Sequence, residues 1–467
     1  MAKYKAYPEY KDSGVEWLKA IPEHWKLSKL RYQFVFGKGL TITKEHLQDE
    51  GIPCVNYGEV HSKYGFEVDP EIHSLKCVSD KYLKDNSNSL LSKGDIVFAD
   101  TSEDIDGSGN FTQLVSDTVT FAGYHTIIAR PFERENSRFY AYLLDCKELR
   151  SQVRHAVKGV KVFSITQAIL RNLSIWLPSK DEQAQIAAFL DHETAKIDNL
   201  IEKQQQLIEL LKEKRQAVIS HAVTKGLHPD VPMKDSSVEW FGEVPEHWQI
   251  KRCKNLFDFV TSGSRGWAGY YSDEGDLFFR IANLTRDSIN PKLDSIQYVT
   301  PPKGSEGERS KIKENDLLIS ITADLGSVCA ADESISGGYV SQHISLCRPS
   351  GLVASSRWLA YFVLSDAAKE QFQGAGYGGT KVQLSLEDIR DLFVAYPPKS
   401  EQEKIAFYLD KRLTELDDLD HCAQNLIELL RERRTALISA AVTGKIDVRD
   451  WVAPDKQDVE ESQEATA

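Results

Sequence analysis

The chain contains two long copies of one sequence pattern, and this duplication limits the folds that it can adopt. The segment LIELLKEKRQAVISHAVTKG (Leu207–Gly226) returns as LIELLRERRTALISAAVTGK (Leu426–Lys445), 219 positions later. A second pair, DSGVEWLKAIPEHW (Asp12–Trp25) and DSSVEWFGEVPEHW (Asp235–Trp248), is offset by 223 positions. Solenoid repeats recur every 20–50 residues or so. Two copies of this length therefore predict one structural unit that is used twice.

The first part of each copy has a mixed pattern. Short β-rich runs such as GDIVFAD (Gly94–Asp100) and NDLLISIT (Asn315–Thr322) lie between Gly, Pro, Asn and Asp turns. Stretches with helical periodicity, Ser137–Val157 and Ser356–Ala375, occupy equivalent places in the two copies. The predicted fold class is α+β, with a curved antiparallel sheet and a few packed helices in each copy.

The second part of each copy is predicted to be a long helix. PSKDEQ (Pro178–Gln183) and PPKSEQ (Pro397–Gln402) place a proline stop and acidic residues at its start. Apolar residues then follow alternating steps of four and three, which is the heptad pattern of a coiled coil. The predicted seam consists of Ile186, Leu190, Ile197, Leu200, Leu207, Leu211, Ile405, Leu409, Leu416, Leu419, Leu426 and Leu430.

Matching heptad registers favour pairing of the two helices with each other. The alternative is that each helix is buried independently against its own globular domain. The seam charges do not decide between a parallel and an antiparallel pair, because both place like and unlike charges opposite each other.

Composition describes an ordinary globular protein that we expect to be cytoplasmic. No apolar run approaches the roughly 20 residues that span a bilayer, and the amino terminus lacks the apolar core of a signal peptide. The seven cysteines form no CxxC pair, which fits a reducing compartment. The net charge of −13 argues mildly against a nucleic-acid partner. Part of that charge lies in the tail Pro454–Ala467, which reads as a disordered acidic end.

These features together resemble the specificity (S) subunit of type I restriction–modification systems. The resemblance rests on EHW, a β-rich domain and P-x-x-x-EQ opening a helix that ends in LIELLKEKRQAVISHAVTKG, all repeated once. It covers the whole chain except the acidic tail. It implies two target recognition domains separated by two helices in an antiparallel coiled coil, with pseudo-two-fold symmetry. The domain boundaries expected are 1–177 and 227–397 for the recognition domains with their leading segments, 178–226 and 398–447 for the helices, and 448–467 for the tail.

The resemblance also implies what the subunit binds. Double-stranded DNA is the expected ligand, together with two modification subunits that carry adenine methyltransferase activity. Two restriction subunits join them to make the ATP-dependent nuclease. No cofactor or metal is expected on this chain, since S-adenosylmethionine, ATP and Mg are expected on its partners. Because the recognition domains have diverged more than the helices, we expect an asymmetric bipartite target with a fixed spacer.

Candidate DNA contacts lie in glycine-rich loops that carry cations and amides. Base readout needs side chains with paired donors and acceptors, and phosphate contact needs cations. In the second recognition domain we expect contacts from Arg265, Trp267, Tyr270, Arg280, Asn283, Tyr377, Lys381 and Gln383. In the first domain we expect them from Arg154, Lys158 and Lys161. The alternative is that these loops are only flexible connections.

Two other features favour structural roles. The recurring pairs His24–Trp25 and His247–Trp248 are interpreted as a corner that anchors each domain on the coiled coil. The acidic residues Glu103, Asp104 and Asp106 are interpreted as a solvated loop rather than a metal site, because the second copy lacks the cluster.

Two other functions are alternatives to the recognition of a DNA sequence. Catalysis by this chain is disfavoured, because the sequence contains no [DN]PP[YF] tetrapeptide and no Walker A loop. A coiled-coil scaffold without its own DNA binding remains the alternative function.

Overall fold

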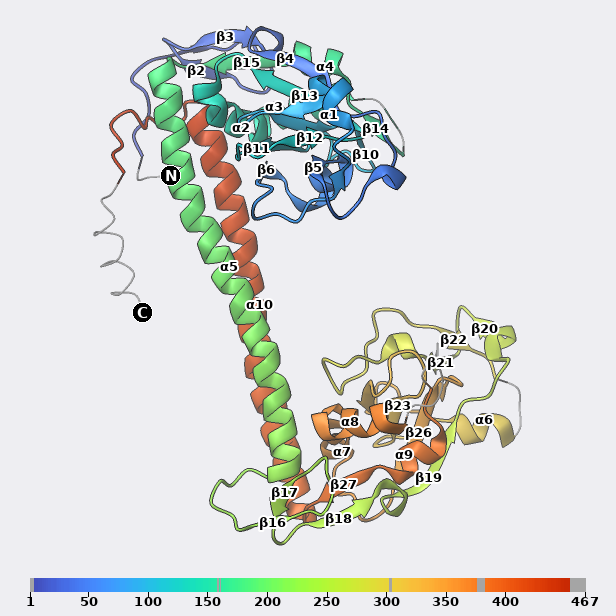
Figure 1. Ribbon diagram of the computed structural model, residues 1–467. Coiled ribbons are helices and arrows are strands. Elements are labelled where there is room, and N and C mark those ends of the chain that lie inside the picture. Colours follow the sequence, from blue (N-terminus) through green and yellow to red (C-terminus); the bar gives the residue numbers. More distant parts are fainter. Residues whose placement is uncertain (1–3, 158, 160, 302–304, 376–382, 454–467) are drawn as a thin grey trace. The chain divides into compact units, whose positions relative to one another are not determined.

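The computed structural model describes residues 4–157, 159, 161–301, 305–375 and 383–453. The acidic tail from residue 454 onward lies outside this range. The chain divides into two compact units. Unit 1 comprises Met1–Lys203 with Leu426–Ala467, and unit 2 comprises Gln204–Asn425. The long helices α5 (Lys180–Lys225) and α10 (Lys399–Val442) each contribute one part to either unit (Figure 1).

Unit 1 is built on a five-stranded sheet of order β4-β13-β9-β11-β6, antiparallel except for the β11–β6 pair. Its strands are β4 (Phe34–Lys38), β13 (Thr126–Pro131), β9 (Ile96–Ala99), β11 (Phe111–Leu114) and β6 (Phe66–Val68). A four-stranded sheet contains β7 (Cys77–Val78), β5 (Ile52–Val55), β12 (Thr120–Ala122) and β8 (Leu90–Leu91). Three two-stranded pairs are β1 (Tyr10–Asp12) with β2 (Ala20–Pro22), β3 (Lys26–Lys29) with β15 (Ser174–Leu177), and β10 (Thr101–Ser102) with β14 (Phe163–Ser164).

Unit 2 repeats the centre of this arrangement. Its main sheet has the order β19-β26-β23-β24, with β19 (Phe257–Ser262), β26 (Ile344–Pro349), β23 (Leu317–Ser320) and β24 (Val328–Ala330). A second sheet contains β20 (Tyr271–Ser272), β22 (Tyr298–Val299), β21 (Asp276–Phe279) and β25 (Tyr339–Val340). The remaining pairs are β16 (Met233–Asp235) with β17 (Glu243–Pro245), and β18 (Gln249–Arg252) with β27 (Phe393–Tyr396). The predicted α+β class with two tandem domains is confirmed.

Short helices cover each main sheet, and here the structure refines the prediction. Unit 1 contains α1 (Tyr82–Asp85), α2 (Ser137–Asp145), α3 (Lys147–Ala156) and α4 (Gln167–Asn172), and unit 2 contains α6 (Ser305–Ser310), α7 (Ser356–Leu364), α8 (Asp366–Ala375) and α9 (Leu386–Asp391). Each long periodic stretch is two helices, because Cys146 and Ser365 take extended backbone angles between them. The helical period continues across the break, so periodicity alone could not locate it.

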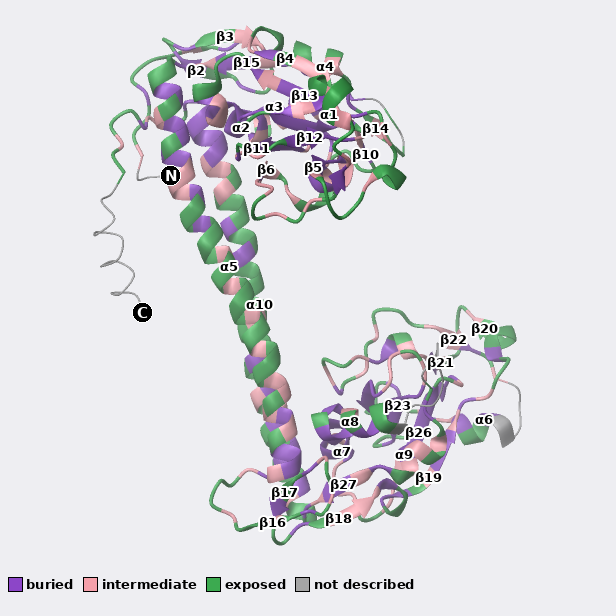
Figure 2. Ribbon diagram, viewed as in Figure 1, coloured by how far each residue is buried: buried purple, intermediate pink, exposed green. Residues whose placement is uncertain are grey.

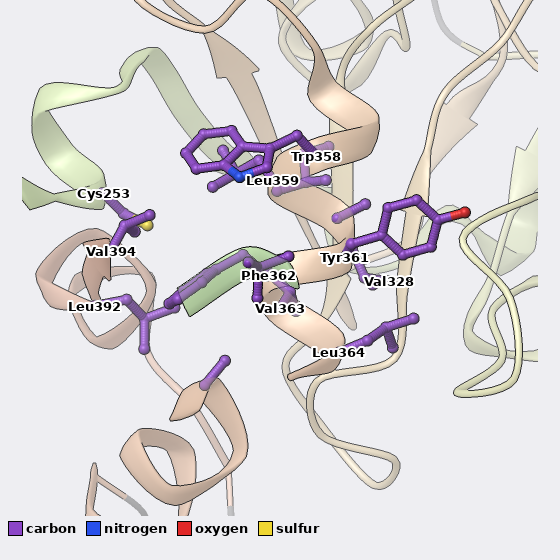
Figure 3. Packing of buried hydrophobic residues seen from close by; sticks show 14 of the residues in the cluster. Cys253, Val328, Trp358, Leu359, Tyr361, Phe362, Val363, Leu364, Leu392 and Val394 are labelled. Atoms are coloured by element: carbon purple, nitrogen blue, oxygen red, sulfur yellow. The ribbon is translucent and has the colours of Figure 1, made fainter. Parts of the chain in front are cut away.

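Each unit has a main core that joins its domain to its own parts of both long helices. In unit 1, Trp25, Trp176 and Phe139 share a core with Ile186 of α5 and Ile438 of α10. In unit 2, Trp248 and Trp358 share one with Ile219 of α5 and Leu409 of α10. Figure 3 shows part of this second core, where α7 packs Trp358 and Phe362 toward Leu392 and Val394. Figure 2 shows burial concentrated near the ends of the helices.

A carboxylate in the first turn of each long helix fixes the predicted corner. In unit 1, Glu182 accepts hydrogen bonds from Trp25 Nε1 at 3.0 Å and Tyr7 OH at 2.6 Å, and lies 2.9 Å from His24 Nε2. In unit 2, Glu401 accepts from Trp248 Nε1 at 2.9 Å and lies 2.7 Å from His247 Nε2. Burial and the bond to Glu182 raise the pKa of Tyr7. The anchoring role predicted for the His-Trp pairs is confirmed.

A second anchor recurs nine residues further along each long helix, at Asp191 after Glu182 and at Asp410 after Glu401. Arg138 Nε and Tyr142 OH of α2 both donate to Asp191 of α5 at 2.7 Å. In unit 2, Arg357 and Tyr361 of α7 make the same contacts with Asp410 of α10. Burial, then the neighbouring aspartate, raises the pKa of Tyr142. The two anchors hold each domain against one helix by charge-assisted hydrogen bonds, which are stronger than neutral ones.

Within each unit the two helices run antiparallel. Arg434 Nε of α10 lies 3.0 Å from Asp198 Oδ1 of α5 in unit 1. In unit 2, Arg215 of α5 pairs with Asp417 of α10. In each unit the end of one helix also meets the corner at the start of the other, since Gly444 lies beside Trp25, which binds Glu182, and Gly226 lies beside Trp248, which binds Glu401. Within each unit, an increase in residue number along one helix thus meets a decrease along the other. The question left open by the seam charges is settled by the contacts, and the helices also pack against their own domains.

Eight of the predicted seam residues are buried or half-buried, and four are exposed. Leu200, Leu207, Leu419 and Leu426 are 47%, 40%, 53% and 41% exposed, whereas the other predicted seam residues are buried or, for Leu211, half-buried. The next residue turns inward instead: Ile427 is 7% exposed, and Ile201, Ile208 and Asp420 are half-buried. In three of these places the two neighbours are Leu and Ile, which fit a heptad equally well, so spacing could not choose between them.

Within the described ranges, no helix is both long and apolar enough to cross a membrane.

The seam correction predicts unequal costs for two neighbouring substitutions. Ile427→Ala removes a buried side chain and should lower the free energy of unfolding by about 2–4 kcal/mol. Leu426→Ala, at an exposed position, should cost less than about 1 kcal/mol. Urea unfolding of the two variants gives the comparison. A larger loss for Leu426→Ala would restore the original register.

The two corners predict that loss of the carboxylate destabilises unit 1 more than unit 2. Glu182 is 4% exposed and Glu401 is 31% exposed. Glu182→Ala leaves two buried donors without an acceptor, so it should destabilise unit 1 by roughly 3–5 kcal/mol, against about 1–3 kcal/mol for Glu401→Ala in unit 2. Amide hydrogen exchange resolves each unit separately, which global unfolding of a two-unit chain does not. Equal protection losses in the two units would contradict the assignment.

Candidate nucleic-acid interface

The loop after β19 carries three of the predicted contacts, and the structure gives them different environments. Arg265 and Tyr270 are exposed. Within the described residues, no ion pair or hydrogen bond involves the Arg265 side chain. Trp267, in contrast, is 3% exposed and lies in a small core with Phe278 and Tyr339. Its indole ring stacks on Phe278 at 6.0 Å. Trp267 therefore shapes the loop from inside.

The predicted contacts after β21 are also held inside the unit. Asn283 is fully buried. Its side-chain amide donates to the carbonyls of Lys292 and Ser295 at 2.9 and 3.0 Å and accepts from the Arg280 backbone at 2.9 Å. A buried amide with these bonds holds a loop and has no free edge for a base, which corrects the expectation for Asn283. Arg280 is half-buried and donates to Ser295 Oγ at 3.4 Å.

The remaining candidates lie on the loops that lead back to the sheet. In unit 1, Arg154 on α3 pairs with Asp106 at 3.4 Å, and Lys161 is exposed just before β14. In unit 2, Gln383 is exposed and bridges to Thr322 through the backbone. The same bridge joins Thr101 to Ser164 in unit 1. Lys158, Tyr377 and Lys381 lie outside the described residues, so their DNA contacts remain predictions.

The acidic loop behaves as a structural turn. Asp104 accepts from the Gly107 amide at 2.5 Å, and Asp106 pairs with Arg154. In the part of the chain that the structure describes, no cluster of three or more His, Cys, Asp or Glu residues could hold a metal ion.

Sequence reasoning missed a cleft in unit 1 whose lining mixes polar and apolar side chains. A cleft of about 630 Å³ opens where β4 and β9 end and β13 begins, between the segments Lys38–Ile42, Gly123–Ile127 and Ile165–Ala168. Its lining includes Asp100 and His125. The sequence signal for this cleft is the histidine shared by YHTIIARP (Tyr124–Pro131) and QHISLCRP (Gln342–Pro349), which recurs at the same place in the two copies.

Comparisons with known proteins agree with this architecture. The family model described as "Type I restriction modification DNA specificity domain" matches residues 22–210 and 245–429. A Methanocaldococcus jannaschii protein, provisionally named the type I restriction enzyme MjaX specificity subunit, is 26% identical over 442 residues, covering 92% of this chain and 95% of that protein. The EcoKI specificity subunit of Escherichia coli is 22% identical over 456 residues, covering 93% and 91%.

Two solved structures share the fold. A chain of a type I R-M system, solved in work on complex assembly and conformational transition, superposes with a TM-score of 0.69 at 17% identity. That match covers 91% of this chain and 99% of the other. The HsdS subunit of Thermoanaerobacter tengcongensis gives a TM-score of 0.51 at 17% identity, covering 91% and 98%. With both domains matched by one model, the chain belongs to the family of type I restriction–modification specificity subunits.

Proposed function

We propose that each unit reads one half of an asymmetric, bipartite DNA target and that the paired helices set the spacing between the halves. The observation that carries this proposal is the contrast between identical anchors and different loops. The Arg-Tyr-Asp and His-Trp-Glu anchors recur in both units. At equivalent positions of the sheet edge, unit 1 has Asp100 where unit 2 has Ile321. A common frame with different reading loops is suited to two different half-sites.

The proposed partners are two modification subunits, joined by two restriction subunits for cleavage. Supporting this stoichiometry, each unit exposes the same three leucines of the repeat. Unit 1 exposes Leu200, Leu426 and Leu429, and unit 2 exposes their repeat equivalents Leu419, Leu207 and Leu210. Exposed leucines on a polar helix are candidates for protein contact. Two equivalent sets suit two copies of one partner.

In this assembly the chain selects sequence and the partners supply chemistry. Adenine methylation by the modification subunits would use S-adenosylmethionine, and cleavage by the restriction subunits would use ATP and Mg. Membership of a specificity-subunit family supports a non-catalytic role for this chain. Such a complex would act in the cytoplasm, because the chromosomal and invading DNA that it binds lies there. The alternative of a scaffold without DNA binding is disfavoured by the same family match.

The leucine sets predict the number of bound modification subunits. Replacing Leu200, Leu426 and Leu429 by serine should reduce the ratio from two modification subunits per chain to one, because exposed leucines contribute docking area rather than fold stability. The matched control replaces Leu419, Leu207 and Leu210, and should also give one. Combining both sets should give none. Native mass spectrometry measures these ratios, and two subunits retained by every variant would refute the docking surface.

The proposed reading function is tested by mapping methylated adenines in a host that carries the system, with and without this chain. The expected result is a bipartite motif that requires the chain. Exchanging residues 249–397 for another recognition domain should then change one half of the motif and leave the other unchanged. Methylation that is independent of the chain, or a motif altered in both halves, would contradict the proposal.

A further inference from the structure

The cleft in unit 1 has the chemistry of a groove-reading surface. Lys38, Thr41, Tyr124 and Gln167 line it with donors and acceptors. Its formal charges are those of Lys38 and Asp100, and Asp100 is engaged by His125 at 3.2 Å. Within the described residues, no carboxylate pairs with Lys38, which is exposed. The cleft therefore offers an available cation on a chain whose average charge is negative.

His125 is held in an unusual conformation at the cleft wall. Its backbone φ is 54°, in the left-handed region that is uncommon for residues other than glycine. Such strain clusters at binding sites, where the surrounding structure maintains it. Because an ionised carboxylate can only accept a hydrogen bond, the Nδ1–H of His125 donates to Asp100. The side chain is 62% exposed.

Unit 2 places different side chains on the same frame. The backbone amides of Asp100 and Ile321 donate to the carbonyls of His125 and His343, both at 3.1 Å, so these positions are equivalent. His343 Nδ1 lies 3.0 Å from Thr322 Oγ1, and its Nε2 accepts from the Gln342 amide at 2.9 Å. Gln342 occupies the position of Tyr124, which also immediately precedes the histidine.

The start of the cleft shows the same substitution of side chains on a common backbone. Gly39 approaches the Gly123 carbonyl, and Gly263 approaches the Val340 and Ser341 carbonyls, so closely that a Cβ would clash in either unit. Two residues later stand Thr41 in unit 1 and the exposed Arg265 in unit 2. Arg265 and Gln383, two of the predicted contacts, thus lie at the edge of the unit 2 sheet that is equivalent to the edge forming the cleft in unit 1.

Resting on the proposed function, we propose that this cleft seats the DNA half-site of unit 1, with Lys38 on a phosphate and Tyr124 and His125 facing base edges. In unit 2, Gln342 occupies the position of Tyr124, and Arg265 lies at the position of Thr41 on the same edge. A glutamine amide fixed by a histidine is suited to adenine, and an arginine to guanine. The histidine is common to both units, and the residue before it differs, which is the pattern expected for a shared support with separate specificities.

The test uses the full chain reconstituted with its modification subunits, and reads both the methylated motif and DNA affinity. Tyr124→Gln should change or relax one half of the motif, with about tenfold weaker binding to the original site. Gln342→Ala should do the same to the other half. Lys38→Ala should leave the motif unchanged and make the slope of log affinity against log salt shallower by about 0.9. Lys26→Ala, an exposed lysine on β3 outside the cleft, is the matched control and should change neither quantity.

Circular dichroism and retained binding of modification subunits establish that each variant is folded. If the unmodified complex reads a bipartite site but all three variants keep its motif, affinity and salt dependence, the cleft is wrong and the proposed function stands. If the unmodified complex shows no sequence preference, both are wrong. A variant that alters both halves of the motif would likewise overturn the assignment of one cleft to one half-site.

Discussion

A single carboxylate in the first turn of each long helix carries much of the architecture. Glu182 and Glu401 each bind the tryptophan and histidine of a Pro-Glu-His-Trp corner, and this joins the start of a helix to the strand that opens the domain. The last turns of the other helix meet the same corner. In unit 1, Tyr10 OH donates to the Gly444 carbonyl at 2.9 Å, and a Cβ at Gly444 would clash with Pro22. Helix pairing and domain attachment are therefore fixed at one place in each unit.

The second anchor makes this attachment rigid. Asp191 and Asp410 each receive an arginine and a tyrosine from the helix that covers the main sheet. With two charge-assisted contacts on one helix, the domain has a defined orientation relative to that helix. Preorganisation of this kind supports recognition, because a reading loop must be held by elements that do not move. The loops can then vary without disturbing the frame.

The repeated patterns made the common frame predictable, whereas the burial of single side chains was not predictable from them. The His-Trp corners, the α+β domains and the long helices follow from patterns that occur twice. In the middle of the seam, the heptad pattern allows either of two adjacent residues, such as Leu426 and Ile427, to face inward. Only packing decides which of them is buried. Trp267 and Asn283 had the residue types of DNA contacts, but burial assigns them to the inside of unit 2. Residue type alone does not indicate whether a side chain is exposed. The backbone strain at His125 is likewise visible only in the structure.

In the proposed assembly, the paired helices set the spacing between two independent reading units. The most direct test removes one heptad from each helix, at equivalent positions, and maps the methylated motif of the reconstituted complex. Seven residues of helix correspond to about 10 Å, or roughly three base pairs of DNA. Both half-site sequences should persist while the spacer between them shortens. An unchanged spacer with both half-sites still methylated would contradict it.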